Sequence, residues 1–291
     1  MKRIIFSFFA LIFLLNIYAC SEDEYDGYFF NESYYKKSEY NIKSYYDELK
    51  IVQWNIGHFS GGGSYSSSIT SDEYVSKIDE YRNLILGTGA DIISLNEYSN
   101  FIGYDRNGNL QKANKVLFNN YGNQYIGKQR RYSCNALFSN LVLNNPVEID
   151  FISNQTAQIT HTAAIQATDY YFIESDIHFN GIDAKLVTAH LAFDLNNEDV
   201  ARNQIMEIID RYSYNDYVIL CGDWNIMDVN NFDYFKLAGY QLANHGKYGD
   251  LITCGTNLMV DNVCVKGFQI KNVEIINSSL SDHKPLLVTL K

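Results

Sequence analysis

Several apolar runs in this sequence end in a polar residue that a buried strand does not itself require. Asn55 follows "IVQW", Glu97 comes after "IISLN", His190 follows "LVTA" and Asp223 follows "VILCG". Binding and catalytic groups gather at strand ends and in the loops after them. These four side chains are therefore candidates for a shared site.

The segment "GDWN" carries two of the candidate groups, Asp223 and Asn225. Residues two apart in an extended segment face the same side, so Asp223 and Asn225 can point into one cleft while Trp224 packs on the other side. A carboxylate can hold or activate water, and a neutral amide can donate to an oxyanion, which together suit phosphate chemistry. The alternative is an Asx-turn that only closes the strand.

A second pair, Asp282 and His283, stands before a final strand that contains Pro285. Such a pair can supply an oxygen ligand for a metal and a proton-transfer or charge-stabilising imidazole. Asp261, in "MVDNVCV", could orient that imidazole as a hydrogen-bond acceptor. The isolated histidines are more typical of solvated or core positions: His58, His161, His178 and His245.

The N-terminus predicts an export signal. Lys2 and Arg3 precede an apolar stretch, 4–15, that is too short for a membrane span. The segment Ile17-Tyr18-Ala19-Cys20 resembles a bacterial lipobox, and the acidic run after it resembles the surface-export signal of Bacteroidetes lipoproteins. We therefore expect residues 1–19 to be removed and Cys20 to carry a lipid anchor, at the outer membrane of the cell envelope and exposed on the surface. The alternative is an ordinary cleaved signal in which Cys20 is incidental.

The rest of the chain predicts a tether and one domain. Residues 20–48 are rich in Tyr, Ser, Asp and Glu and predict a tether, although some of its tyrosines could pack onto the domain. Residues 49–291 are long enough for one sizeable globular domain, and we expect a monomer. Loss of residues 1–19 moves the formal charge from −11 to −13, because two of the 23 basic residues and no acidic residue are removed.

The acidic balance argues against a global nucleic-acid footprint, because such a surface repels polyanions at long range. A locally basic or metal-filled cleft could still bind phosphate. The one compact basic cluster, Lys128, Arg130 and Arg131, is more typical of a solvated loop than of a phosphate clamp. Among the cysteines, Cys254 and Cys264 could pair in an oxidising envelope, and the lack of a Cys-x-x-Cys pair argues against a zinc ribbon.

Strands dominate the predicted secondary structure, and helices are interleaved. Helical spacing of Tyr74, Ile78, Tyr81 and Ile85, with Ser71 as N-cap, predicts a helix that ends near Gly87. A second helix is predicted over 196–213 and a short one over 232–237. Strands are predicted over 49–54, 90–99, 134–143, 170–179, 184–193, 217–225, 257–265 and 283–290.

In chain order, these residues resemble the endonuclease/exonuclease/phosphatase superfamily, the DNase I-like proteins. The most specific pieces are "GDWN" for its Gly-Asp-x-Asn, "SDHKPL" for its Ser-Asp-His-x-Pro and "ADIISLNE" for its strand ending in glutamate. "VTAHL" is similar to its Thr-His-Leu strand, with Ala189 in place of the usual threonine. The resemblance covers nearly all of residues 49–291. It implies an α/β fold, a four-layered sandwich of two mostly antiparallel sheets with helices outside.

The resemblance also implies roles in a metal-dependent phosphoesterase. Glu97 would be the principal ligand of Mg²⁺, or of Mn²⁺ or Ca²⁺, with Asn55 and Asp282 as further oxygen groups. Asp223 would position or deprotonate the attacking water, and His283, oriented by Asp261, would stabilise the transition state. The resemblance gives phosphate contacts to Asn225, to Asn135 and to His190, the last of which would alternatively protonate the leaving oxygen.

Some positions depart from the family's pattern. Cys134 stands where a glycine usually precedes Asn135, and Gly57 stands where members that process abasic DNA carry an acidic residue. The loop that contains Gly61–Gly63 could line the entrance, and either Tyr125 or Tyr132 could be the family's active-site tyrosine.

The resemblance leaves the substrate open between extracellular DNA and a phospholipid head group or inositol phosphate. A non-catalytic binding lipoprotein with the same fold is a second hypothesis. A third is an adhesin with tyrosine-rich contacts to glycans.

Overall fold

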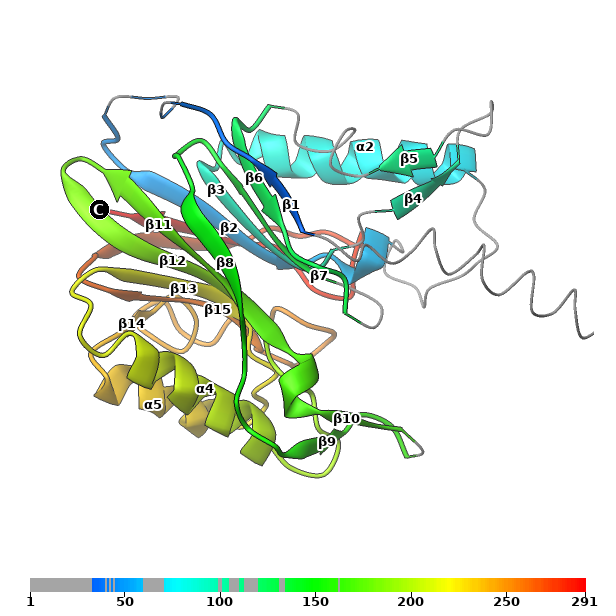
Figure 1. The fold of residues 1–291 in the computed structure, drawn as a ribbon, viewed down its shortest axis with the longest axis vertical. Coiled ribbons are helices and arrows are strands. Elements are labelled where there is room, and N and C mark those ends of the chain that lie inside the picture. The colour runs from blue at the N-terminus through cyan, green and yellow to red at the C-terminus, as the bar shows by residue number, and fades with distance from the viewer. Residues whose placement is uncertain are drawn as a thin grey trace, which may run out of the picture.

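Two β-sheets packed face to face form the centre of the molecule, and helices cover their outer faces (Figure 1). The structure is a computed structural model that describes residues 33–39, 41, 43, 45–59, 71–98, 101–104, 110–112, 120–130, 134–161 and 163–291. One sheet has seven strands in the order β1-β6-β7-β3-β2-β17-β16, and the other has six in the order β14-β15-β13-β12-β11-β8.

The strands and helices have the following bounds. The seven-stranded sheet contains β1 (Tyr34–Lys36), β2 (Leu49–Asn55), β3 (Ile92–Tyr98), β6 (Asn123–Ile126), β7 (Cys134–Ser139), β16 (Ile270–Ile275) and β17 (Leu286–Leu290). The six-stranded sheet contains β8 (Asn144–Asp150), β11 (Tyr171–Phe179), β12 (Ile182–His190), β13 (Val218–Asp223), β14 (Gln241–Leu242) and β15 (Asp261–Lys266). Two small hairpins pair β4 (Phe101–Tyr104) with β5 (Leu110–Lys112) and β9 (Thr156–Gln158) with β10 (Ala164–Gln166). The helices are α2 (Ser71–Gly87), α4 (Asp199–Arg211) and α5 (Asp233–Leu237), with short 3-10 turns η1 (Gly57–Phe59), η2 (Ala167–Asp169) and η3 (Val229–Phe232).

The arrangement confirms the predicted four-layered sandwich. Helix α2 lies outside the seven-stranded sheet, and α4 and α5 lie outside the six-stranded sheet (Figure 1). The described strand pairs are antiparallel except β2 with β3 and β12 with β13, which are parallel. Each parallel pair is central in its sheet. The carboxyl ends of these four strands lie at the same end of the sandwich.

Strand β13 shows how alternation positions the polar end groups. Ile219 and Cys221 pack in the core between the sheets, whereas Val218 and Leu220 pack in the core under α4. Asp223 has the same parity as Ile219, so its side chain continues the row that faces the opposite sheet. Gly222 is required here, because a Cβ at this position would lie 2.5 Å from the carbonyl oxygen of Ala189 on the neighbouring strand.

A β-bulge in β3 breaks this alternation. Leu95 pairs with Ala136 and Tyr98 with Cys134, so β3 has one more residue than β7 over this stretch. Glu97 has a positive φ of 49°, a conformation that non-glycine side chains rarely adopt. A bulge re-aims side chains locally. Two consecutive residues, Asn96 and Glu97, are thereby both available to the site.

The Asn96 carboxamide joins the two sheets beneath this end of the sandwich. Its oxygen accepts hydrogen bonds from Gln53 Nε2 at 2.7 Å and from the Asp223 backbone N–H at 3.0 Å. Its nitrogen donates to Asn135 Oδ1 at 2.8 Å and to the Ala189 carbonyl at 2.9 Å. Asn96 is completely buried, and all four hydrogen-bonding positions of its side chain are used.

Part of the predicted tether belongs to the folded body. Strand β1 pairs with β6 at the edge of the seven-stranded sheet, and Tyr46 is buried. The Asn41 carboxamide donates to the His178 carbonyl and accepts from the Val142 N–H, and Lys43 forms an ion pair with Asp91 at 2.9 Å. These residues of the segment predicted as a tether therefore contact the domain through their polar groups and tyrosines. The predicted signal segment and Cys20 lie outside the described residues.

The helices follow the predicted periodicity. Ile78, Tyr81 and Ile85 of α2 are fully buried, and Ile205 and Ile208 of α4 are fully buried against the six-stranded sheet. Ser71 is the first residue of α2, one position later than an N-cap. In the described part of the chain, no helix is both long and apolar enough to cross a bilayer.

Two other expectations require correction. The possible bridge between Cys254 and Cys264 is absent, because both are free thiols. Cys264 is buried on β15 opposite Leu220, whereas Cys254 forms a backbone bridge with His283. The strand predicted over 134–143 ends at Ser139, whose hydroxyl accepts a hydrogen bond from the Leu141 N–H and turns the chain.

We predict that Asn96→Ala lowers the free energy of unfolding by about 3 kcal/mol, because each buried polar partner left unsatisfied costs roughly 1–3 kcal/mol. Urea denaturation followed by tryptophan fluorescence measures the change. The matched control, Asn272→Ala on the exposed face of β16, should change stability by less than about 0.5 kcal/mol. Equal effects of the two substitutions would contradict the assigned role of Asn96.

Candidate functional site

Asp223 lies at the centre of a polar cluster where the two sheets meet. Its Oδ2 accepts a hydrogen bond from Asn55 Nδ2 at 2.9 Å, across the gap between β13 and β2. The His190 and His283 Nε2 atoms lie 3.6 Å and 3.7 Å from the same oxygen. These separations are longer than direct hydrogen bonds, so the two imidazoles flank the carboxylate without bonding to it. The side chain is 1% exposed.

The surroundings of Asp223 favour its ionised form. Burial acts to raise the pKa of the carboxyl group, but the charges of His283 and His190 and the hydrogen bond from Asn55 outweigh it and lower the pKa below its ordinary value. Asp223 is therefore an anion at neutral pH that is almost completely shielded from solvent. Such a group can orient a water molecule or accept its proton.

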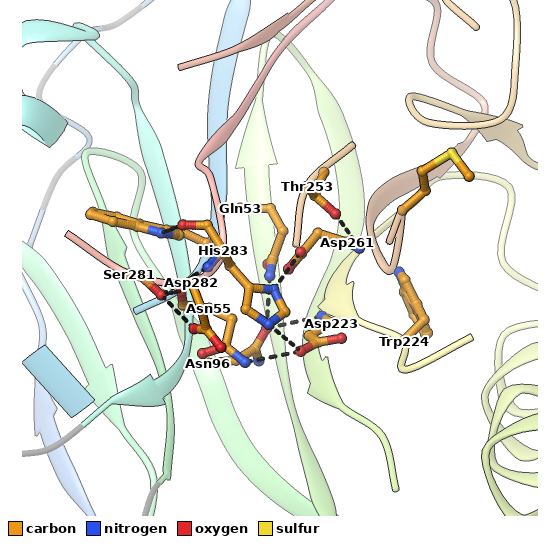
Figure 2. A network of polar contacts seen from close by, with 12 residues as sticks. Gln53, Asn55, Asn96, Asp223, Trp224, Thr253, Asp261, Ser281, Asp282 and His283 are labelled. Carbon is orange, nitrogen blue, oxygen red and sulfur yellow. Dashed lines mark hydrogen bonds and ion pairs between the residues drawn. The ribbon is translucent and has the colours of Figure 1, made fainter. Parts of the chain in front are cut away.

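His283 is held between two carboxylates (Figure 2). Its Nδ1 lies 2.7 Å from Asp261 Oδ2. Burial acts to lower the pKa of the imidazole, but Asp261 and Asp223 raise it well above its ordinary value. At neutral pH, His283 is therefore an imidazolium whose Nε2 faces the cluster. The contact between Nδ1 and Asp261 is the one through which Asp261 was predicted to orient the His283 ring.

Asn225 follows Asp223 on a strained turn. Its φ is 50°, and its backbone N–H donates to Asp223 Oδ1 at 3.1 Å, while its side-chain nitrogen donates to the Leu191 carbonyl at 2.8 Å. The Asx-turn considered for this segment is therefore present. It coexists with the site, because Asp223 uses Oδ1 for the turn and Oδ2 toward Asn55. Trp224 points away and is completely buried (Figure 2).

Glu97 lies between two histidines. Its Oε1 is 4.0 Å from His190 Nε2, and its Oε2 is 3.3 Å from His58 Nε2. His58 was not predicted as a site residue, because it follows no strand pattern and isolated histidines are common. It reaches Glu97 because Gly57, His58 and Phe59 all have positive φ, between 54° and 61°, which turns the chain sharply after β2.

Asp282 and Asn55 meet at this same turn. A Cβ at Gly57 would lie 3.6 Å from Asp282 Oδ1, and the Gly57 N–H donates to Asn55 Oδ1. The Ser281 hydroxyl donates to the Asn55 carbonyl at 2.9 Å and lies 3.2 Å from Asp282 Oδ1. A Cβ at position 57 would also lie 3.0 Å from Ser281 Oγ, and this close approach together with the positive φ favours glycine there.

The donor set fits a hard divalent cation. Glu97 supplies a carboxylate that is 29% exposed, Asp282 is an exposed carboxylate, and Asn55 keeps one oxygen lone pair beyond the Gly57 bond. Oxygen donors with room for retained water suit Mg²⁺. Asp223, Asp261 and His283 also cluster within 4.8 Å, but the imidazolium already neutralises the charge between those carboxylates.

A cavity of about 180 Å³ opens beside Glu97 and His190. Asn135 lines it, and its side chain donates to the Tyr171 carbonyl at 3.0 Å. Its other lining residues are His58, Arg130, Cys134, Ile159, Asp169, Tyr170 and Tyr171.

Two tyrosines that were not predicted, Tyr170 and Tyr171, line the cavity, because β11 begins next to β7 only in the folded sandwich. Of the two predicted candidates, Tyr125 is buried in the seven-stranded sheet, and Tyr132 lies outside the described residues. The Tyr171 hydroxyl donates to the Lys128 carbonyl and accepts from the Asn135 N–H.

Arg130, in the loop between β6 and β7, lines the cavity. Its guanidinium lies over the Tyr171 ring, 4.4 Å from the centroid, and pairs with Asp150 at 2.6 Å. This ion pair compensates the positive charge. The rest of the predicted basic cluster includes Arg131, which lies outside the described residues, as do Gly61–Gly63.

The comparisons with known proteins identify the fold. No family model matches the sequence, and no curated protein matches it. Among solved structures, D. rerio TDP2 complexed with a single-strand DNA product has a TM-score of 0.60 at 15% identity, over 84% of this chain and 100% of that one. An endonuclease/exonuclease/phosphatase family protein from Leptotrichia buccalis has a TM-score of 0.61 at 16% identity, over 84% and 99%. The catalytic domain of human Nocturnin with a bound sulfate anion has a TM-score of 0.56 at 14% identity, over 89% and 97%.

The chain has the endonuclease/exonuclease/phosphatase fold. The similarity extends over most of the described domain and nearly the full length of these structures, so the resemblance stated from the motifs is confirmed at the level of fold. The endonuclease/exonuclease/phosphatase fold brings the predicted residues from β2, β3, β12, β13 and the segment before β17 to one end of the sandwich.

We predict that the His283 imidazole titrates well above about 6.5, and that Asp261→Asn lowers its pKa by removing the nearer carboxylate. NMR of the histidine rings across pH measures both values. A group with a raised folded-state pKa stabilises the fold below its unfolded value and loses that contribution as pH rises through the folded value. The stability difference between wild type and Asp261→Asn should therefore shrink at alkaline pH. A His283 pKa at or below 6.5 in the wild type would contradict the geometry.

Proposed function

We propose that the protein is a metal-dependent hydrolase of phosphate ester bonds. One observation carries the proposal: an ionised, buried Asp223 and a protonated His283 lie 3.7 Å apart, next to a histidine that contacts the more exposed carboxylate of Glu97. Carboxylate, imidazolium and an oxygen-rich metal site are the groups that water attack on a phosphate requires. The fold shared with TDP2 and Nocturnin supports the same class of activity.

We assign the metal to Glu97, with Asn55 and Asp282 as further oxygen donors. Mg²⁺ is the preferred ion, with Mn²⁺ or Ca²⁺ as alternatives, because all three donors are hard oxygen groups. When bound, the ion would polarise the phosphate and neutralise its charge.

The protein's own groups then perform the remaining steps. Asp223 orients the attacking water and takes its proton, and Asn55 holds the carboxylate in place through the 2.9 Å hydrogen bond. His283 donates from Nε2 to the developing charge on phosphate, while Asp261 fixes the ring through Nδ1. Asn225 and Asn135 hold phosphate oxygens, and His190 contacts the phosphate or protonates the leaving oxygen.

Two substrate classes have support. TDP2 of D. rerio was solved with a single-strand DNA product, which favours nucleic acid. The formal charge of −11 opposes long-range attraction of a polyanion, so a nucleic acid would have to be held locally at the metal site.

A membrane phospholipid is favoured by the direction of β1. Tyr34 pairs with Ile126, the last residue of β6. From there the chain continues through Gly127 to Arg130, which lines the cavity. Tyr34, the first residue of β1, therefore lies toward the end of the domain that carries the site. We propose that Cys20 is lipidated at the surface of the outer membrane. Fourteen residues span at most about 50 Å, so such an anchor would hold a monomeric domain with its site toward the bilayer.

We predict that the wild type hydrolyses bis-p-nitrophenyl phosphate with Mg²⁺ and that EDTA abolishes the activity. Asp223→Asn should lower kcat by about 10²–10⁴-fold, the usual contribution of acid–base groups. Glu97→Ala should lower it at least as far and weaken Mg²⁺ binding measured by calorimetry. The control Asp183→Asn, whose side chain is 92% exposed at the far end of β12, should match the wild type. Equal activity in the wild type and in Glu97→Ala would contradict the proposal.

We predict that anchoring raises turnover of phospholipid but not of DNA. The measurement compares lipidated protein in sphingomyelin vesicles with a soluble Cys20→Ser form, using plasmid DNA and inositol phosphates in parallel. Faster sphingomyelin hydrolysis by the anchored form supports the phospholipid candidate. Cleavage of DNA alone, at equal rates in both forms, would assign the protein as a nuclease.

A further inference from the structure

Three different metal-ligating side chains meet around His283. The Cys254 thiol, the Asp282 carboxylate and the His283 imidazole have ligand atoms that all lie within 4.8 Å of one another. Of the four cysteines in the described part of the chain, Cys254 is the one that is partly exposed, and the other three are buried. Asp282 is exposed, so the cluster opens to solvent.

The backbone holds these residues in register. Cys254 forms an antiparallel bridge with His283. The Gly255 N–H donates to the Asp282 carbonyl at 3.0 Å, and the Lys284 N–H donates to the Thr253 carbonyl at 2.7 Å. The three side chains therefore project from two paired segments whose relative position is fixed.

We propose that Cys254, Asp282 and His283 form a binding site for Zn²⁺ or a similar thiophilic divalent ion, which shares Asp282 with the magnesium site assigned at Glu97. Thiolate, imidazole and carboxylate are the ligands of tetrahedral zinc, at about 2.0–2.3 Å, and a water molecule completes the coordination. Ligand atoms around such an ion lie about 3.3–3.8 Å apart. Because the ligand atoms lie within 4.8 Å of one another, the cluster would contract by at most about 1.5 Å.

The contact between His283 and Asp261 supports this assignment. A histidine that binds zinc usually donates its other ring N–H to a carboxylate, which fixes the ring. Asp261 Oδ2 occupies that position at Nδ1, 2.7 Å away, so Nε2 is the nitrogen left for the ion. Zinc would replace the proton on the thiol and the proton on Nε2, and both protons would go to solvent.

Bound zinc would inhibit the hydrolase, because the ion takes the His283 Nε2 that stabilises the transition state. This consequence rests on the proposed function, whereas the binding of zinc does not. A thiolate ligand does not favour Mg²⁺, so saturating Mg²⁺ should compete only for the shared Asp282 and should not displace zinc from Cys254 and His283.

The test uses the mature chain, residues 20–291, as wild type, Cys254→Ser and Cys254→Ala, with folding checked by circular dichroism. Zn²⁺ binding is measured by calorimetry in excess Mg²⁺, and Co²⁺ serves as a spectroscopic probe of a thiolate–metal bond. We expect one Zn²⁺ per chain, a thiolate-to-Co²⁺ absorption band, and binding at least about 10-fold weaker in both variants. Alkylation of Cys254 by iodoacetamide should be slowed by Zn²⁺.

Two outcomes would overturn the site. Equal Zn²⁺ affinity in wild type and Cys254→Ser shows that the thiol is not a ligand. Displacement of Zn²⁺ by Mg²⁺ places the ion at Glu97 instead. With bis-p-nitrophenyl phosphate, Zn²⁺ should inhibit the wild type and spare Cys254→Ser in excess Mg²⁺. Zinc bound through Cys254 without inhibition would contradict the assigned role of His283 but not the site.

Discussion

The site depends most on the hydrogen bonds of the Asn96 carboxamide. It lies completely buried between the two sheets and uses both its donor and its acceptor capacity, toward Gln53, Asp223, Asn135 and Ala189. An unpaired polar group in such a place is costly, so the four partners fix one relative position of the sheets. That position sets the gap that Asn55 spans to reach Asp223 at 2.9 Å.

Burial and the order of the charged side chains determine the electrostatics of the gap between the two sheets. Asp261, His283 and Asp223 form an alternating row of negative, positive and negative groups, with His283 in the middle (Figure 2). Each neighbour favours the charged form of the next, although at Asp261 burial has the larger effect and raises the pKa of the carboxyl group above its ordinary value. Glu97 lies outside this row at the more exposed end, where an oxygen ligand can still exchange water for a metal.

Much of the site could be predicted from the sequence because strand ends are visible as polar interruptions of apolar runs. Asn55, His190 and Asp223 are the last residues of β2, β12 and β13, and the two-residue spacing of Asp223 and Asn225 correctly placed Trp224 in the core. Local pattern carries this information, since side-chain parity along a strand is a property of the backbone.

The rest depended on pairings and backbone conformations that local pattern does not encode. The bulge that turns Glu97 arises from the register of β3 against β7, and His58 reaches Glu97 through three consecutive positive φ angles. The role of Asn96 is likewise invisible before the sheets are packed, because a polar residue inside an apolar run has no partner in its own strand. The docking of β1 on β6 joins residues about 90 positions apart.

In the proposed mechanism, one divalent ion and one phosphate meet between Glu97 and His283. Anomalous diffraction from crystals grown with Mn²⁺ and a phosphate mimic such as vanadate would locate both. We expect a manganese peak within coordination distance of the Glu97 carboxylate, with the anion in contact with His283 Nε2 and close to Asp223. A manganese peak away from Glu97, or an anion bound elsewhere on the domain, would contradict it.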